Sequence, residues 1–198
     1  MACRSVLNGG IGIDCDGLIG GVADRLILIN YDDFASATVD TDFPDGNVYS
    51  AFTLKSGGKV GYLFEGKGNA SIVVRQNPIV NSYGQVDGYT HEVDFVAFKD
   101  DPIALAQLER IARAKMMALF ESNGLFWVLG KDSGLFASGL ATDTSNADAR
   151  GAGTVSLISK TEPRLKRNLG VWTGTYPTMS HDYNASKALF DGLLTPTA

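Results

Sequence analysis

A glycine–lysine run is the first place in this sequence where residue types and spacing could do chemistry. GLFWVLGKDSGLFASGL covers residues 124–140, and a Gly-Lys pair of this kind can hold phosphate. A P-loop needs two glycines separated by four residues, then Lys, then Ser or Thr. Here Gly124 and Gly130 are separated by five residues. Asp132 follows Lys131, so the run offers no hydroxyl to a magnesium ion and predicts no P-loop.

The order of elements around these glycines also argues against a nucleotide site. A P-loop runs from strand to loop to helix, whereas the clearest helical pattern of this chain precedes the glycines. No βαβ unit surrounds them, as a dinucleotide-binding fingerprint requires. We interpret the run as two strands, 125–129 and 135–139, joined by the turn Gly-Lys-Asp-Ser-Gly. No nucleotide or other cofactor is predicted.

The chain has only two histidines that could act as general bases. His91 falls in a predicted strand beside Glu92, whose side chain should point to the opposite face. We therefore interpret His91 as a structural residue. His181 stands between Ser180 and Asp182, but a nucleophilic triad is assembled in space and not by three consecutive residues. The sequence therefore predicts no catalytic residue and no enzyme.

Candidate metal ligands are few. The pairs Asp32 and Asp33, and Asp100 and Asp101, are expected in turns and helix caps. The DTD triplet at residues 40–42 could bind calcium but lacks the Gly and the distal Glu of an EF-hand loop. Two cysteines, Cys3 and Cys15, cannot complete a tetrahedral zinc site without nearby His. Free thiols are favoured over a disulfide between them, since the cytosol disfavours disulfides. No metal site is predicted.

Composition limits the classes of protein that this chain can be. Its 198 residues, 44% of them hydrophobic and 20% charged, are enough for one soluble domain with a proper core. The net charge of -5 argues against gripping DNA phosphates, which takes clustered Lys and Arg. Such a chain could still line a channel through which DNA slides. No apolar run reaches the roughly 18 residues of a membrane span, and no signal peptide is recognised, so we expect synthesis in the cytosol and no membrane partner.

The elements that must position these residues are mostly strands. Short apolar or alternating runs are separated by Gly-, Pro- and Asn-rich turns, as strands and hairpins require. The runs 48–54 and 59–65 around Gly57-Gly58 predict a hairpin, and Pro78 predicts a sheet edge or a bulge. The predicted strands are 25–31, 48–54, 59–65, 70–80, 89–98, 125–129, 135–139 and 154–163.

One amphipathic helix is expected at residues 101–122. Asp101 can cap it, and Pro102 suits the first turn. Apolar side chains recur at three- and four-residue spacing, which predicts one buried face. Those side chains are Leu105, Leu108, Ala112, Met116 and Leu119.

The two ends of the chain differ from the middle. Residues 1–24 are Gly-rich and are predicted as an N-terminal arm. Residues 164–198 begin with a small basic cluster of Arg164, Lys166 and Arg167 and include a predicted short helix, 186–194. We interpret 164–198 as a C-terminal extension that packs on a neighbour or folds back.

Several stretches resemble one protein family. They are the N-terminal Cys3 and Cys15, GGVADRLILINYDDFASATVD, YTHEVDFV, NGLFWVLGKDSGLFAS and GTVSLISKTEP. Across residues 1–163 the chain resembles the tail-tube proteins of tailed bacteriophages, and more closely the tail-tube-like virion proteins of phages of Bacteroidetes. The resemblance implies an α+β, mainly β fold: a β-sandwich or barrel over residues 25–163 with one flanking helix.

The resemblance also implies a function. The chain would be a structural protein of the virion that associates into rings, hexameric in that family, stacked around a conduit for DNA. DNA would pass without specific binding, because an acidic lumen repels it. Segments 1–24, 32–47 and 141–153 are expected to order when they contact neighbouring copies. The alternative is a β-sandwich module that binds carbohydrate or a receptor on a virion or cell surface, with Trp172, Tyr176 and Tyr183 as its aromatic contacts.

Overall fold

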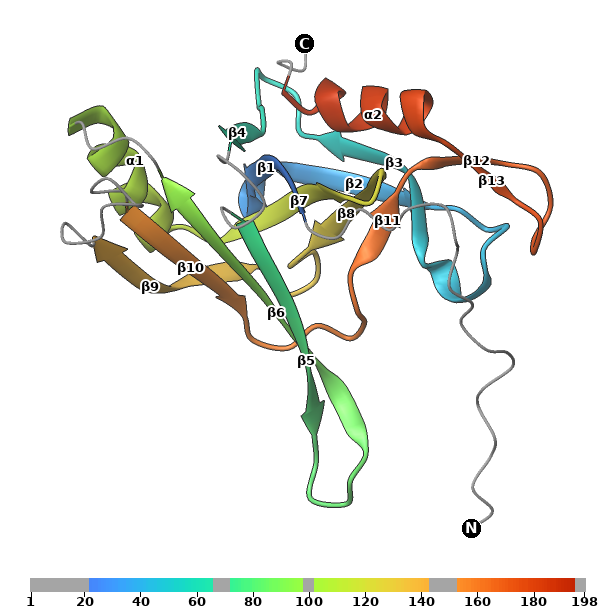
Figure 1. The fold of residues 1–198 in the computed structure, drawn as a ribbon, viewed down its shortest axis with the longest axis horizontal. Coiled ribbons are helices and arrows are strands. Elements are labelled where there is room, and N and C mark those ends of the chain that lie inside the picture. Colours follow the sequence, from blue (N-terminus) through green and yellow to red (C-terminus); the bar gives the residue numbers. More distant parts are fainter. Residues whose placement is uncertain (1–21, 66–71, 98–101, 143–152, 195–198) are drawn as a thin grey trace.

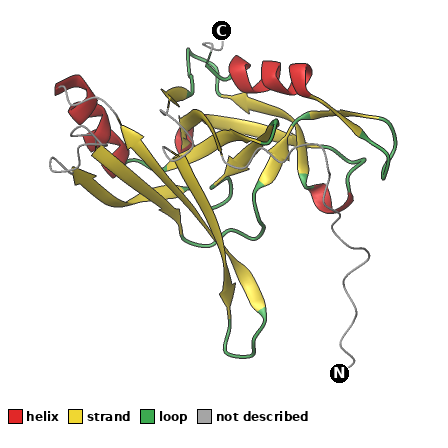
Figure 2. Cartoon of the chain, viewed as in Figure 1, coloured by secondary structure: helices red, strands yellow, loops and turns green. Residues whose placement is uncertain are grey.

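The computed structural model describes residues 22–65, 72–97, 102–142 and 153–194. Most of these residues form strands, and two α-helices pack on them (Figures 1 and 2). The helices are α1 (Pro102–Arg113) and α2 (Tyr183–Gly192), with short 3-10 turns η1 (Tyr31–Asp33) and η2 (Pro44–Gly46). The strands are β1 (Val22–Asn30), β2 (Phe34–Val39), β3 (Val48–Leu54), β4 (Tyr62–Glu65), β5 (Ile72–Val80), β6 (Val86–Ala97), β7 (Met116–Ser122), β8 (Leu125–Leu129), β9 (Leu135–Thr142), β10 (Gly153–Ser159), β11 (Arg167–Leu169), β12 (Val171–Thr173) and β13 (Ser180–Asp182). The predicted α+β, mainly β class is confirmed.

Within the described residues, eleven strands form one large sheet, and β12 with β13 forms a separate ribbon. The main path is β2-β3-β11-β8-β7-β9-β10-β6-β5, with β1 paired to β7 and β4 paired to β1. All pairs are antiparallel except β11 with β3. In the described part of the chain the end strands β2 and β5 do not pair with each other, so of the predicted sandwich or barrel, the structure shows no closed barrel.

Strand β1 shows why the molecule has two hydrophobic cores. Its side chains alternate, so Leu26 and Leu28 face one core whereas Ile27 and Ile29 face the other. All four are fully buried. Each such side chain stabilises the fold by about 1.5–3 kcal/mol. A strand covered on both faces therefore lies at the centre of the molecule.

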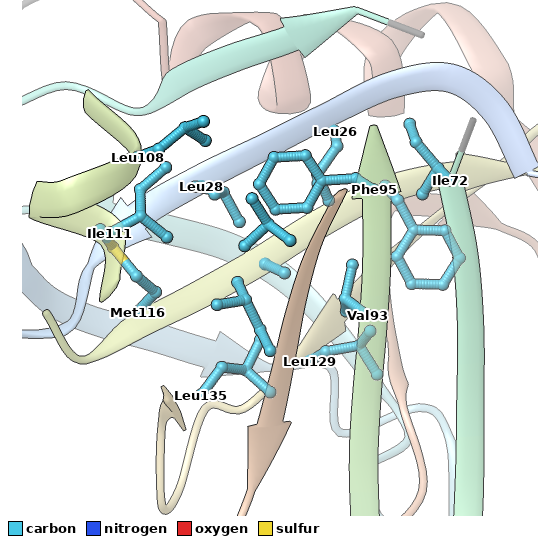
Figure 3. Packing of buried hydrophobic residues seen from close by; sticks show 14 residues of the cluster. Leu26, Leu28, Ile72, Val93, Phe95, Leu108, Ile111, Met116, Leu129 and Leu135 are labelled. Carbon is cyan, nitrogen blue, oxygen red and sulfur yellow. The ribbon is translucent and has the colours of Figure 1, made fainter. Parts of the chain in front are cut away.

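The first core lies between two halves of the sheet, one containing β1 and β7 and the other containing β6 and β10. Helix α1 closes it (Figure 3). Side chains of β1 and β7 meet those of β6 and β10 there, and Leu108 and Ile111 of α1 complete it. The second core lies on the opposite face of β1 and β7, under α2, which contributes Phe190.

The predicted helix 101–122 is wrong beyond Arg113. The chain leaves the helix there, and residues Met116–Ser122 form β7, which pairs with β1 and with β8. The predicted contact of Leu108 with the sheet core is confirmed, but Ala112 is exposed. Met116 and Leu119 are buried as strand residues, facing different cores.

Two predicted hairpins also differ from the structure. Strands β3 and β4 do not pair, because β3 lies between β2 and β11 while β4 pairs with β1. Strands β8 and β9 are present and joined by the turn 130–134, but β8 pairs with β7 and β11, and β9 pairs mainly with β10. Segment 32–47, expected to order only on contact with neighbouring copies, contains β2 within the single chain. Pro78 lies on the sheet edge, as predicted, because β5 is an end strand.

The predicted C-terminal extension is an integral part of the packed unit up to Leu194. Strand β11 lies within the sheet, between β3 and β8, and Leu169 is buried in the second core. The predicted short helix is present as α2 and covers the same core. Residues 164–194 therefore fold back onto the rest of the chain, one of the two arrangements expected for the extension.

Candidate functional site

The turn 130–134, which resembles a phosphate loop in composition, is organised around a buried carboxylate. Glu162 is 2% exposed, and its oxygens accept hydrogen bonds from the backbone N–H groups of Asp132 (3.1 Å) and Ser133 (2.9 Å). The Ser133 hydroxyl donates to the same carboxylate at 2.7 Å. The backbone N–H groups of Asp132 and Ser133 are thus already engaged by a carboxylate of the same chain.

His91 holds the other end of this turn. It lies in β6, 3% exposed, with Glu92 on the opposite face, as predicted. Its Nδ1 accepts from the Gly130 N–H at 3.2 Å, so Nε2 carries the proton and donates to the Arg164 carbonyl at 2.9 Å. Burial lowers the pKa of His91, although the charge of Glu162 opposes that shift. Both ring nitrogens bind backbone groups, so the geometry gives His91 a structural role.

A small pocket opens beside this cluster, with room for about one water molecule. Three cationic side chains and a tyrosine border it together with the buried polar groups. The lining residues are Tyr49, His91, Val128, Lys131, Asp132, Glu162, Arg164, Leu165 and Arg167.

Tyr49 is a buried residue that lines the pocket. It is 1% exposed, and burial raises its pKa to about 12, so its hydroxyl stays protonated. Arg167 donates to this hydroxyl at 2.7 Å, and its guanidinium carbon lies 5.2 Å from the ring centroid. Lys131 pairs with Asp132 at 3.0 Å, and Arg164 donates to the Asp45 carbonyl.

The structure divides the predicted basic cluster. Arg164 and Arg167 both border the pocket, whereas the Lys166 ammonium lies 4.2 Å from the ring centroid of Trp127. Burial lowers the pKa of Lys166. Sequence reasoning noticed the charges but missed Tyr49 and Glu162, because neither belongs to a motif and both reach the site from distant strands or linkers.

The second histidine lies apart, in the β12–β13 ribbon. His181 contacts the Trp172 ring, with centroids 5.0 Å apart. Asp182 instead caps α2, accepting from the Ala185 N–H at 3.0 Å. Ser180 is exposed and paired with Thr173. The three consecutive residues therefore form no triad.

The other candidates give no metal site in the described residues, where no group of three or more His, Cys, Asp or Glu side chains is clustered. Asp40 accepts from the Asp42 N–H within a turn, and Asp33 pairs with Lys59 at 3.0 Å. Cys3, Cys15, Asp100 and Asp101 lie outside the described residues, as do most of the segments 1–24 and 141–153.

The aromatic residues proposed for carbohydrate binding are separated. The Trp172 indole donates to Asn168, and Tyr183 stacks on Phe126 with its hydroxyl bound to Glu121. Tyr176 is 56% exposed. No ring contact joins the three in the described part of the chain.

A different exposed cluster lies at the end of the β5–β6 hairpin, which projects from the rest of the sheet (Figure 1). Its apolar side chains are Val80 (55% exposed), Tyr83 (88%) and Val86 (50%). The tip is ordered by Asn81, whose Oδ1 accepts from the N–H groups of Tyr83 and Gln85 at 3.0 Å each. The sequence predicted a turn between the strands 70–80 and 89–98 but not the projection of this hairpin.

Comparison with protein-family models, curated proteins and solved structures finds no match. None of the helices in the described residues is long and apolar enough to cross a membrane.

Proposed function

We propose that this chain is a structural protein of a phage virion, which forms rings of the tail tube or neck conduit through which DNA passes. The observation that carries the proposal is the open sheet, whose end strands β2 and β5 each have one unpaired edge among the described residues. The proposal includes the finer fold, in which the two halves of the sheet around the first core form the sandwich implied by the resemblance.

The β2 edge supports pairing with another copy. Its sequence, FASATV, contains no charged residue and no Pro. Monomeric proteins usually protect an edge strand with Lys, Pro, bulges or a covering segment; β2 has two register irregularities against β3 but no such side chain. An edge of this kind pairs readily with a further strand, because pairing satisfies its backbone groups.

Two different edges favour a ring over a two-fold dimer. When β2 of one copy pairs with the part of β5 that precedes Pro78 in the next, the same head-to-tail interface repeats around an axis, and repetition closes the ring. Six copies are taken from the tail-tube resemblance. The projecting tip with Tyr83 then reaches beyond the ring to contact the next one, since exposed apolar side chains on an ordered tip suit protein contacts.

The net charge of -5 fits a conduit that DNA crosses without adhering. This function needs no catalytic group, cofactor or metal, and it places the chain in the virion after assembly in the host cytoplasm.

Ala35→Lys tests the proposal, because Ala35 is an exposed residue of the β2 edge. We expect wild-type protein to form rings or tubes by native mass spectrometry and negative-stain microscopy, and Ala35→Lys to stay monomeric with an unchanged melting temperature. Ala112→Lys, at an exposed position of α1, is the matched control and should assemble normally. A wild-type chain that remains monomeric at high concentration, also with its phage's other tail proteins, would contradict the proposal.

A further inference from the structure

Two arginines that line the pocket beside Glu162 have hydrogen-bond donors left over. Arg167 donates to the Tyr49 hydroxyl, and Arg164 donates to the Asp45 carbonyl. Neither arginine has a carboxylate within ion-pair distance among the described residues. A guanidinium has five N–H donors, so both side chains keep donors for a further partner.

Tyr49 adds a donor that is already dehydrated. Its hydroxyl accepts from Arg167, and no acceptor for the hydroxyl's own proton is found among the described residues. Tyr49 is 1% exposed, so bulk water does not reach its hydroxyl, and the pocket is the space in which an acceptor for this proton could lie. A buried donor left without an acceptor is unfavourable, which favours a guest that accepts hydrogen bonds.

The charges of the lining point to an anionic guest. Lys131, Arg164 and Arg167 are cationic, and Asp132 and Glu162 are anionic, which leaves one positive charge in excess. Asp132 already pairs with Lys131, and the Glu162 oxygens already bind the turn. Of the charged residues that line the pocket, Arg164 and Arg167 are therefore the ones available to bind a new anion.

We propose that this pocket binds one carboxylate group and that, in the assembled protein, an acidic side chain of a second copy supplies it. The second part rests on the proposed function. The pocket has room for about one water-sized group, so one carboxylate oxygen would enter it while the rest of the acidic side chain stays outside, beside the exposed Arg164. Arginine pairs with a carboxylate in a planar, two-point geometry, which gives strength and direction.

The first experiment measures the pocket in the monomer, which Ala35→Lys supplies. Sodium acetate is titrated at pH 7 and constant ionic strength while NMR shifts of the Arg164, Arg167 and Tyr49 signals are followed, with sodium phosphate in a parallel titration. We expect saturable shifts with acetate, and about tenfold weaker binding in Tyr49→Phe and Arg164→Gln. Arg110→Gln, at an exposed site of α1, and Tyr62→Phe, on exposed β4, should bind acetate as the parent does.

Three results would overturn the carboxylate site. They are the absence of saturable shifts with acetate, equal binding in Tyr49→Phe and Arg164→Gln, and saturation by phosphate but not by acetate. A well-folded Tyr49→Phe spectrum shows that any loss comes from the hydroxyl, and Arg164→Gln changes an exposed side chain that the core does not use.

The second experiment asks where the carboxylate comes from. If a second copy supplies it, Arg164→Glu should weaken ring formation at least about tenfold in concentration, and acetate should compete with assembly of the wild type. Arg110→Glu should not weaken assembly. Acetate binding with assembly unaffected by Arg164→Glu would leave the pocket as a site for a free carboxylate and contradict the second copy as its source. Failure of the proposed ring appears separately, as a wild type that does not assemble.

Discussion

The turn 130–134 and the hairpin tip 81–85 each depend on one side chain that accepts two backbone N–H groups. In the first turn the acceptor is Glu162, which is 2% exposed and comes from a different part of the chain. In the second it is Asn81, which belongs to the tip itself. An acceptor that bridges distant segments stabilises the whole fold, whereas a local acceptor orders only its own turn. The comparison separates a turn that the fold requires from one that is free to contact other molecules.

The largest expected effect follows from removing the distant acceptor. Glu162→Ala should lower the free energy of unfolding by about 3 kcal/mol, because it leaves two backbone N–H groups and the Ser133 hydroxyl without their acceptor in a buried site. Urea denaturation followed by circular dichroism measures this. Glu109→Ala, on the exposed face of α1, is the control and should change stability by less than about 0.5 kcal/mol. Equal effects of the two substitutions would contradict the role of Glu162.

A smaller effect should come from protonating His91, which holds the other end of the same turn. Burial keeps its pKa below the ordinary value of about 6.5. The unfolded chain therefore binds a proton first as the pH falls, so stability is present above about pH 6.5 and is lost below it. The urea midpoint should drop between pH 7 and pH 5.5, and less so in His91→Gln. Burial also lowers the pKa of His181, so His181→Gln is needed to separate the two contributions. An identical pH dependence in wild type and His91→Gln would count against this assignment.

Asn81→Ala should cost less than about 1 kcal/mol, because the N–H groups of the exposed tip can bind water instead. Hydrogen exchange of Tyr83 and Gln85 should nevertheless accelerate strongly, while exchange in β7 stays unchanged. A loss of stability close to that of Glu162→Ala would show that the tip is not independent of the fold.

The smallest effect on stability is expected for Tyr83→Ser, which should change only the stacking of rings. The side chain is 88% exposed, so the melting temperature should not change. Under the proposed function, rings should still form but should stack into tubes poorly. Tyr62→Ser, at an exposed tyrosine of β4 outside the proposed interfaces, should leave both rings and tubes intact. Normal tube lengths in Tyr83→Ser would remove the tip from the stacking interface.

The sequence predicted most strands but not their partners. The turn at 81–85 and the edge position of Pro78 follow from local turn chemistry, which single residues carry. Pairing of β3 with β11, or β4 with β1, depends on contacts between segments far apart in the chain, and no local pattern encodes it.

The helix error has a specific cause. Met116 to Phe120 are all buried, because β7 is covered on both faces, and such a strand lacks the alternation that distinguishes it from a buried helix. Met116 and Leu119 therefore continued the three- and four-residue spacing of the true helix. No Gly or Pro between Arg113 and Met116 marked the change.

The candidate site was predicted only in part. His91 was recognised as a structural strand residue, and the basic residues were noticed as a group. Glu162 and Tyr49 carry no motif, because their roles arise only when the 160–166 linker passes the turn 130–134 and β3. Burial of a polar side chain is a tertiary property, and a single sequence does not display it.

The parallel pair of β3 and β11 has a consequence for the order of events during synthesis. Strands β2 and β3 join the rest of the sheet through β11, which pairs with β8 on its other side. A ribosome must therefore translate Leu169 before β3 can dock, although β3 itself emerges more than a hundred residues earlier. Such long-range closure is slow compared with local hairpin formation. The nascent chain therefore cannot place its β2 edge beside the rest of the sheet until Leu169 has been translated.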